Sequence, residues 1–188
     1  MESLTGRLLV ASPDLIDPNF KRTVIYLCSH GPEAALGLIL NKPLEDVPVV
    51  SHLADWGHAV SEPRILFRGG PVERDSVFAL ARSSGLEDPS VRIDGWIPAA
   101  NGLGLVNIGA SPRELGFELA AARVFLGYAG WGEGQLDGEV AEGAWFPLSA
   151  QPGDVFTETP ATLYRDVLLR QPGRLAMYAL FPDDPRQN

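Results

Sequence analysis

A glycine-rich turn between an apolar run and an acidic segment, in residues 124–145 (VFLGYAGWGEGQLDGEVAEGAW), constrains the fold more than any other stretch. The run Val124–Leu126 has residues typical of a strand, and the glycines after it predict a turn with unusual backbone angles or a close approach. Over residues 134–142 the apolar spacing changes to that of a helix, with Leu136 and Val140 on one face. We therefore expect a strand, a tight turn and a short helix in succession.

A polar stripe of Gln135, Glu139 and Glu142 lies on another face of this predicted helix, between Trp131 and Trp145. Two interpretations stay open. The tryptophans form the walls of a ligand groove with Gln135 and Glu139 as its polar contacts, or the rings cover a core and the polar pair bonds to neighbouring loops. The large area of a Trp side chain favours the core for the rings. No such preference exists for Gln135 and Glu139.

The order of strand, turn and helix is also that of nucleotide-binding loops, but the residues exclude that class. No window reads G-x-G-x-x-G, and no G-K-[ST] follows the glycines. Glu133, Asp137 and Glu139 lie in or beside the first turns of the predicted helix, where they would repel a phosphate. With no cofactor fingerprint elsewhere, we expect no cofactor.

Charge and hydropathy set the class of protein. The chain has 15 Lys plus Arg and 24 Asp plus Glu, a formal net charge of −9, and its basic residues are scattered. Such a surface repels phosphate backbones, so we expect no direct nucleic-acid binding. No apolar run approaches the ~20 residues of a membrane span, and the start of the chain lacks the features of a signal peptide. We therefore expect no membrane association, a cytoplasmic location and one domain over residues 1–188.

Cys28 and His30 lie two residues apart on one face of the clearest predicted strand, 23–29. A thiolate and a base at this spacing would suit nucleophilic catalysis. A lone cysteine in so apolar a strand is typical of an inert core residue, which we favour.

We expect no metal site. A single cysteine excludes the common cysteine-based zinc sites. His52, Asp55 and His58 are spaced at i, i+3 and i+6 in a predicted helix, so they do not face one point.

The sequence Arg68-Gly69-Gly70-Pro71 fits two kinds of turn. Backbone N–H groups of the glycines would bind an anion beside the arginine. Pro71 lacks such a donor and no helix follows, which favours an ordinary tight turn.

The remaining patterns predict many short strands and few helices. Strands are expected at 7–11, 23–29, 37–40, 65–68, 76–81, 91–97, 103–108, 124–126, 145–148 and 154–157, with 91–97 pairing to 76–81 across a turn at 87–90. Helices are expected at 46–57, from the capping box Ser111-Pro112-Arg113-Glu114 through Ala122, at 134–142, and from Thr159-Pro160 to about 172. Such runs of strands favour an α+β fold with a mixed sheet.

Four segments resemble, in order and spacing, the YqgE/AlgH family of small bacterial proteins: ASPDLIDPNFKRTVIYLCSH, GLILNKP, FRGGPV and LGYAGWGEGQLDGEVAEGAW. The match covers roughly residues 4–158, and four separated motifs are more specific than one. The resemblance implies a single-domain α+β fold in which a mixed, mostly antiparallel sheet partly closes into a barrel and is surrounded by helices. It implies no settled activity, although some members have been labelled transcriptional regulators.

The family pattern falls on residues of all four segments: Asp17, Pro18, Phe20, Asn41, Pro43, Gly69, Gly70, Pro71, Gly130, Trp131, Gly134, Gln135, Leu136, Glu139 and Trp145. The chain departs from the pattern near its end. Tyr164 stands where the family commonly has a Trp, and residues 172–188 resemble a variant tail.

These features leave three functions open. We favour a non-catalytic binding or regulatory module with a groove for a small molecule or a peptide. The alternative is a hydrolase-like enzyme in which Glu139 is the general base, its pKa raised by the surrounding tryptophans. A regulator acting on DNA is disfavoured by the net charge. The candidate ligand-binding residues are Asn41, Arg68, Gly69, Gly70, Trp131, Gly134, Gln135, Glu139 and Trp145.

Overall fold

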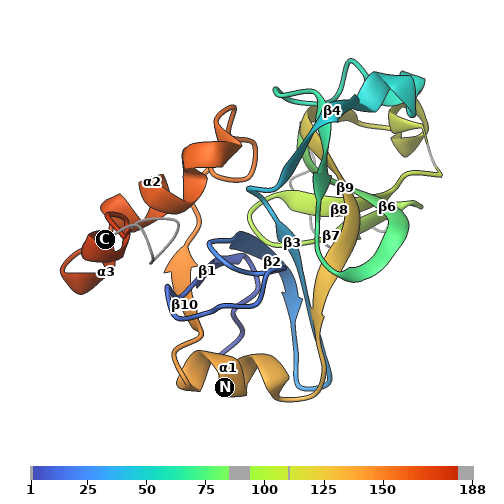
Figure 1. Ribbon diagram of the computed structural model, residues 1–188. Helices are drawn as coiled ribbons and strands as arrows, with labels where there is room; N and C mark the ends of the chain where they lie inside the picture. The colour runs from blue at the N-terminus through green and yellow to red at the C-terminus, as the bar shows by residue number, and fades with distance from the viewer. Residues whose placement is uncertain (1, 85–93, 110, 182–188) are drawn as a thin grey trace.

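A ten-stranded sheet with the strand order β10-β1-β2-β3-β9-β6-β8-β7 forms the framework of the computed structural model, which describes residues 2–84, 94–109 and 111–181 (Figure 1). Outside this path, β4 pairs with β5, and β5 joins β9. The strands are β1 (Arg7–Ala11), β2 (Val24–His30), β3 (Ala35–Ile39), β4 (Pro43–Pro48), β5 (Ile65–Arg68), β6 (Val72–Ser84), β7 (Trp96–Pro98), β8 (Leu103–Asn107), β9 (Glu118–Trp131) and β10 (Trp145–Ser149). The α-helices are α1 (Gln135–Ala141), α2 (Leu163–Leu169) and α3 (Arg174–Tyr178), and short 3-10 helices are η1 (Val49–Ser51), η2 (Ala54–Trp56), η3 (Pro112–Leu115) and η4 (Pro160–Thr162).

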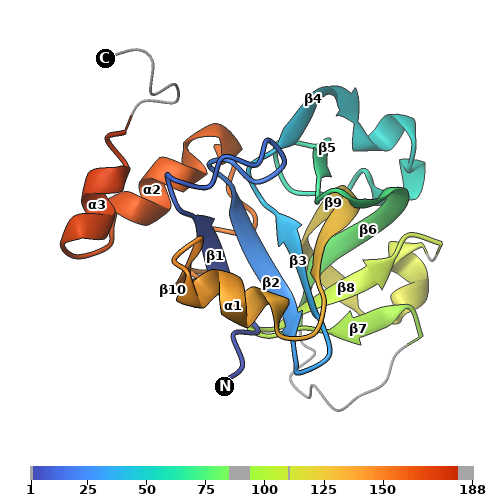
Figure 2. The ribbon, with the colours of Figure 1, turned by 60° about the horizontal axis from the view of Figure 1, so that its bottom comes forward.

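The sheet curls into a half-barrel, and its described strand pairs are antiparallel except for β5 with β9, where Phe67 lies beside Phe125. The predicted α+β fold with a mixed, mostly antiparallel sheet is confirmed. Its helices are few and short. Helices α2 and α3 lie beside β1 and β10 at one end of the sheet, and α1 crosses near β1 and β2 (Figure 2).

The central strands β6 and β9 separate two hydrophobic cores. Leu80 and Phe125 pack in the larger core with β1, β2, β3 and α2, whereas Ala79 and Val124 pack in the smaller core with η1 and η2. Successive residues of a strand point to opposite faces. Both faces of these strands are therefore covered, which explains why the run at 124–126 is apolar without a break.

Most predicted elements are present. The strands predicted at 7–11, 23–29, 37–40, 65–68, 76–81, 103–108, 124–126 and 145–148 are confirmed with shifted ends, as are the helices predicted at 134–142 and after Thr159-Pro160.

The helix predicted at 46–57 is wrong. The chain continues as β4 through Pro48, which pairs with β5, and then forms only the short turns η1 and η2, interrupted at Leu53 in a non-helical conformation. The predicted apolar face is nevertheless used, because Val49 and Trp56 are buried in the smaller core. Pairing with β5 overrides the local helical spacing.

The helix predicted from Ser111 through Ala122 is also wrong beyond its first turn. The capping box forms as expected, and the Ser111 N–H donates to Glu114 Oε2 at 2.9 Å. Gly116 then ends η3 with a left-handed φ of 73°, a conformation that glycine adopts at little cost. Residues 118–122 join β9 and pair with β6, so long-range pairing again overrides an alanine-rich local sequence.

Two further strand predictions need correction. Strand β7 pairs with β8, which lies between β7 and β6, so the expected pairing of 91–97 with 76–81 is wrong for the described part of that segment. The expected turn at 87–90 and residues 91–93 lie outside the described residues. Residues 154–156 form a turn in place of a strand and Thr157 is irregular. The carbonyls of Val155 and Thr157 accept hydrogen bonds from the side chain of Arg123.

Candidate functional site

Trp131 and Trp145 pack together at the end of the half-barrel next to α1. Trp131 ends β9, and Trp145 begins β10. Their ring centroids lie 6.0 Å apart in an edge-to-face arrangement, and Phe20 contacts both rings at 6.4 and 5.5 Å. The two tryptophans are only 5% and 2% exposed. Both rings therefore belong to the larger core, as their area favours.

The carboxylate of Glu139 holds this cluster together. Its Oε2 accepts the indole N–H groups of Trp131 and Trp145 at 2.9 and 2.8 Å. Its Oε1 accepts the side-chain N–H of Gln135 at 2.8 Å, and Gln135 Oε1 accepts the N–H of Gly132 at 3.1 Å. A buried indole N–H needs an acceptor. Glu139 supplies one acceptor for two indoles and, through Gln135, secures the glycine turn.

Gly134 allows α1 to start directly after this turn. It adopts a left-handed φ of 64° as the residue that precedes the helix. An open space surrounds its missing side chain, so the backbone angle is the reason for glycine at this position.

Asn41 anchors the loop 12–22 to the sheet. Its Oδ1 accepts the N–H of Val24 at 2.9 Å, and its Nδ2 donates to the carbonyl of Arg22 at 2.9 Å. The adjacent Lys42 donates to the carbonyls of Pro18 and Asn19 at 3.0 and 2.8 Å, and partial burial lowers the pKa of this lysine. Asn41 and Lys42 thus use their polar atoms to shape this loop.

Gly69 and Gly70 let the chain pass closely against β9. A Cβ at Gly69 would lie 2.1 Å from the carbonyl oxygen of Gly127, and one at Gly70 would lie 2.1 Å from the carbonyl carbon of Tyr128. The N–H of Gly69 donates to Leu126, so it is not directed at an anion. Close approach of two backbones explains this glycine pair. The preceding Arg68 is exposed.

The predicted residues thus form two groups. Trp131, Gly134, Gln135, Glu139 and Trp145 gather at α1, while Asn41, Arg68, Gly69 and Gly70 gather where β3, β5 and β9 meet. The loop 12–22 links them, because Phe20 packs on the tryptophans and Asn41 binds Arg22 two residues further along the loop.

Both groups lie in a segment with clear relatives. A family model described as AlgH-like matches residues 8–176, which contain every predicted site residue. The chain belongs to the AlgH-like family. The family resemblance inferred from the four segments is confirmed.

Relatives match this AlgH-like chain over nearly their whole length. A UPF0301 protein from Streptomyces coelicolor is 46% identical over 188 residues, which cover 100% of this chain and 97% of the relative. A protein structure from Corynebacterium diphtheriae has a TM-score of 0.86 at 34% identity, covering 96% of this chain and 94% of that one. The solution structure of the AlgH protein from Pseudomonas aeruginosa has a TM-score of 0.69 at 26% identity, covering 96% and 95%.

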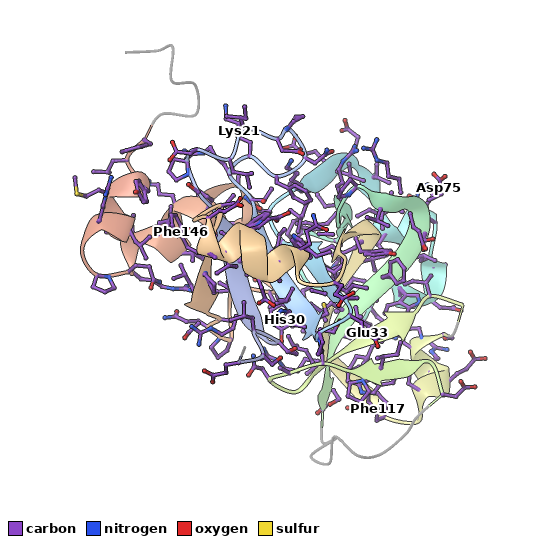
Figure 3. The ribbon with its side chains drawn as sticks, turned by 90° about the horizontal axis from the view of Figure 1, so that it is seen from below. Lys21, His30, Glu33, Asp75, Phe117 and Phe146 are labelled. Atoms are coloured by element: carbon purple, nitrogen blue, oxygen red, sulfur yellow. The ribbon has the colours of Figure 1, made fainter. Side chains whose placement is uncertain are left out.

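Cys28 and His30 of this AlgH-like chain are both held in place. Burial raises the pKa of the Cys28 thiol to about 12, so the reactive thiolate is suppressed. His30 Nδ1 accepts the N–H of Leu4 at 3.0 Å, and its Nε2 lies 3.4 Å from Asp137 Oδ1 of α1. Figure 3 shows His30 beside that helix. Nδ1 is thus hydrogen-bonded and Nε2 faces Asp137, which agrees with the inert interpretation of the pair.

Arg123 is a buried residue that the sequence interpretation missed. Its side chain is 0% exposed, lies 4.4 Å from the Phe67 ring and donates to the carbonyls of Val155, Glu62 and Thr157 at 2.7–2.9 Å. Burial lowers the pKa of this guanidinium to about 10. The available signal was a lone charge inside the apolar run 119–126.

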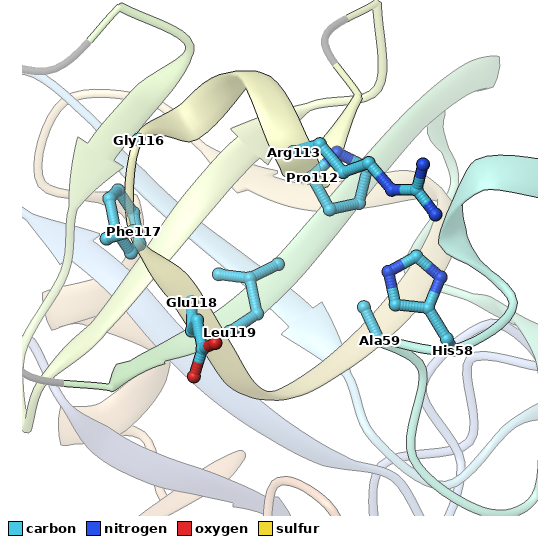
Figure 4. Close-up of a pocket in the computed structure, with 8 residues that line it drawn as sticks. All are labelled: His58, Ala59, Pro112, Arg113, Gly116, Phe117, Glu118 and Leu119. Carbon is cyan, nitrogen blue, oxygen red and sulfur yellow. The ribbon is translucent and has the colours of Figure 1, made fainter.

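A cavity of about 510 Å³ opens between η3, the start of β9 and the segment at His58 (Figure 4). Arg113 extends toward His58, whereas the carboxylate of Glu118 points away from both. Its polar groups thus do not converge on one point. A second cavity of about 280 Å³ is lined by His52, Asp55 and their neighbours. No cluster of three metal-ligating side chains occurs among the described residues.

Another cavity, of about 350 Å³, lies between β2, β6, β8 and the segment 150–155. Tyr26, Arg82, Asn101 and Gln151 bring polar groups to an otherwise apolar wall. None of these three cavities is lined by a residue that the sequence predicted as ligand-binding.

No helix in the described residues is both long and apolar enough to cross a bilayer.

Proposed function

We propose that this AlgH-like protein is a cytoplasmic, non-catalytic binding or regulatory module for a small molecule or a peptide. The observation that carries the proposal is the state of the Glu139 carboxylate, which accepts three N–H groups at 2.8–2.9 Å. A general base needs a lone pair that can reach a water or a substrate hydroxyl. Here Oε2 already accepts the indole N–H groups of the core, and Oε1 accepts the amide of Gln135 on the helix surface.

The exposed members of the predicted set are the proposed ligand contacts. Gly134 and Gln135 are exposed at α1, where the buried Trp131 and Trp145 would support them from behind, and Arg68 is exposed in the second group, where β3, β5 and β9 meet. A ligand at the α1 group would meet the polar atoms of the glycine turn and Gln135 over an aromatic base, an arrangement that suits binding without chemistry.

The hydrolase alternative is less well supported. If Oε2 acted as the base, it would have to release an indole donor, which would leave a buried N–H unpaired at a cost of about 1–3 kcal/mol. If Oε1 acted, it would share its lone pairs with the exposed amide of Gln135. Direct action on DNA is weaker still, because a net charge of −9 repels phosphates.

A ligand screen of the isotope-labelled full chain tests the proposal. Metabolite and peptide mixtures are added, amide shifts are recorded, and each bound compound is followed for product by one-dimensional proton NMR. We expect one compound class to shift a contiguous set of residues and to stay unchanged for hours, with binding retained in Glu139→Gln. Turnover of a bound compound by the wild type that Glu139→Gln abolishes would establish the enzyme instead.

A further inference from the structure

Arg82 on β6 is the group that distinguishes the 350 Å³ cavity from the other two. Its Nη2 donates to the carbonyl of Pro152 at 3.2 Å, and the guanidinium lies 5.6 Å from the centre of the Phe156 ring. Its Nε atom is buried and donates no hydrogen bond to any described residue. A buried donor without an acceptor is costly, and the bond to Pro152 is the one hydrogen bond that Arg82 donates within the described residues.

No carboxylate of the described residues forms an ion pair with Arg82. The acid in the segment 150–155, which lines the same cavity, is engaged elsewhere. Asp154, the buried acid of the segment 150–155, accepts two hydrogen bonds from Arg170, one of 2.7 Å, and also caps the N–H of Gln151. Its two oxygens are therefore engaged away from Arg82. A half-buried guanidinium with no countercharge within the described residues is unusual in a chain of net charge −9.

The other polar groups of the cavity are neutral and bond within the protein, which leaves Arg82 as the charged group of the wall. Tyr26 donates from its hydroxyl to the carbonyl of Ala100 at 2.9 Å, and Asn101 donates from Nδ2 to the carbonyl of Gly6 at 3.1 Å. Burial raises the pKa of Tyr26 to about 12, so its hydroxyl stays neutral and adds no competing negative charge. Apolar atoms of Leu103, Ala150, Pro152 and Val155 complete the wall.

We propose that this cavity binds a small organic anion, in which a carboxylate or phosphate group pairs with Arg82 and an apolar body lies against Leu103 and Val155. Arginine is well suited to this role because its guanidinium presents parallel N–H donors to two oxygens of one anionic group. The inference rests on the proposed binding function and gives that function a ligand class. The larger cavity fits such a ligand less well, because Arg113 there is exposed and Glu118 shares the wall.

Titration of the labelled full chain with benzoate and with phenyl phosphate tests the assignment. Benzyl alcohol serves as the neutral control, and inorganic phosphate serves as the anion without an apolar body. We expect at least one aromatic anion to shift the Arg82 Nε–H resonance and the side-chain amides of Asn101 and Gln151. Benzyl alcohol and inorganic phosphate should each bind about tenfold more weakly or worse.

Two arginine variants locate the site. Arg82→Gln should weaken the aromatic anion by about tenfold or more, whereas Arg113→Gln, which lines the larger cavity, should leave it unchanged. Arg82→Gln with a native spectrum and unchanged affinity would overturn the inference, as would equal binding of benzyl alcohol. If Arg82→Gln does not fold, the wild-type titration provides the test. A shift of the Arg82 Nε–H resonance with an aromatic anion would support the inference, and no shift would overturn it.

The same titrations separate this inference from the proposed function. If neither aromatic anion shifts Arg82 but other compounds of the wider screen bind elsewhere, the anion site is wrong and the binding function stands. If no compound binds anywhere, both are wrong.

Discussion

Glu139 and Arg123 are two charged side chains that meet neutral partners in opposite ways. Glu139, half-buried at the edge of the half-barrel, accepts N–H groups from three side chains. Arg123, fully buried on the central strand β9, donates to three backbone carbonyls. The acid thus fixes aromatic packing, and the base fixes two loops. In both cases one charge satisfies several dipoles that would otherwise be buried without partners.

The comparison also shows why such charges differ in cost. Burial lowers the pKa of Arg123, which means that the folded protein holds this cation at an energetic cost. Its three carbonyls and the Phe67 ring offset that cost. Glu139 retains contact with solvent, so its charge costs less to bury and its hydrogen-bond partners have less of that cost to offset. We therefore expect the arginine to matter more to stability than the glutamate.

Replacement of Arg123 should have the largest effect. Arg123→Met keeps an apolar stem but leaves three carbonyls without a donor, at about 1 kcal/mol or more each. We expect a loss of about 3 kcal/mol or more in the free energy of unfolding, measured by urea denaturation. Arg68→Met, an exposed arginine on the neighbouring β5, is the control and should change stability by about 0.5 kcal/mol or less. Equal effects of both variants would break the comparison.

Replacement of Glu139 should have an intermediate effect. Glu139→Ala removes the acceptor of two buried indole N–H groups, and we expect a loss of about 2 kcal/mol by the same measurement. Glu142→Ala lies on the same predicted polar stripe but is exposed, so it should change stability by about 0.5 kcal/mol or less. A loss from Glu139→Ala that exceeds that of Arg123→Met would reverse the proposed order.

Cys28 sharpens the comparison because its buried thiol avoids charge altogether. Its folded pKa of about 12 lies above the ordinary value of 9.0, so between these values the folded state holds a proton that the unfolded state has released. Stability from this group is complete below pH 9 and falls as pH rises toward 12. We expect Cys28→Ala to show a shallower alkaline loss of stability than the wild type. If the free energy of unfolding falls equally steeply with alkaline pH in Cys28→Ala and in the wild type, the raised pKa of Cys28 would be contradicted.

Much of the fold was accessible from the sequence, because β1, β2 and β10 carry apolar patterns that match their burial. The failures occur where a strong local signal competes with pairing to a distant strand. The Ser111 capping box was correct, yet Gly116 and the pairing of β9 with β6 limited it to one turn. Such pairing depends on residues far along the chain, which a local pattern does not contain.

The candidate site was predictable in part for the same reason. Trp131, Gln135, Glu139 and Trp145 are close in sequence, so their spacing alone indicated a cluster. The carbonyl partners of Arg123 and the wall of the Arg82 cavity come from distant segments. Tyr26, Arg82 and Gln151 meet only through the curvature of the sheet.

Hydrogen exchange of the indole Nε1–H groups of Trp131 and Trp145 tests the central claim most directly, in the free protein and with a saturating ligand from the screen. If Glu139 is a structural acceptor, both N–H groups exchange slowly in both states and lose protection together in Glu139→Ala. Rapid exchange of either group in the free protein, or its release when a ligand binds, would show that the Glu139 carboxylate is available for chemistry and would contradict a non-catalytic role.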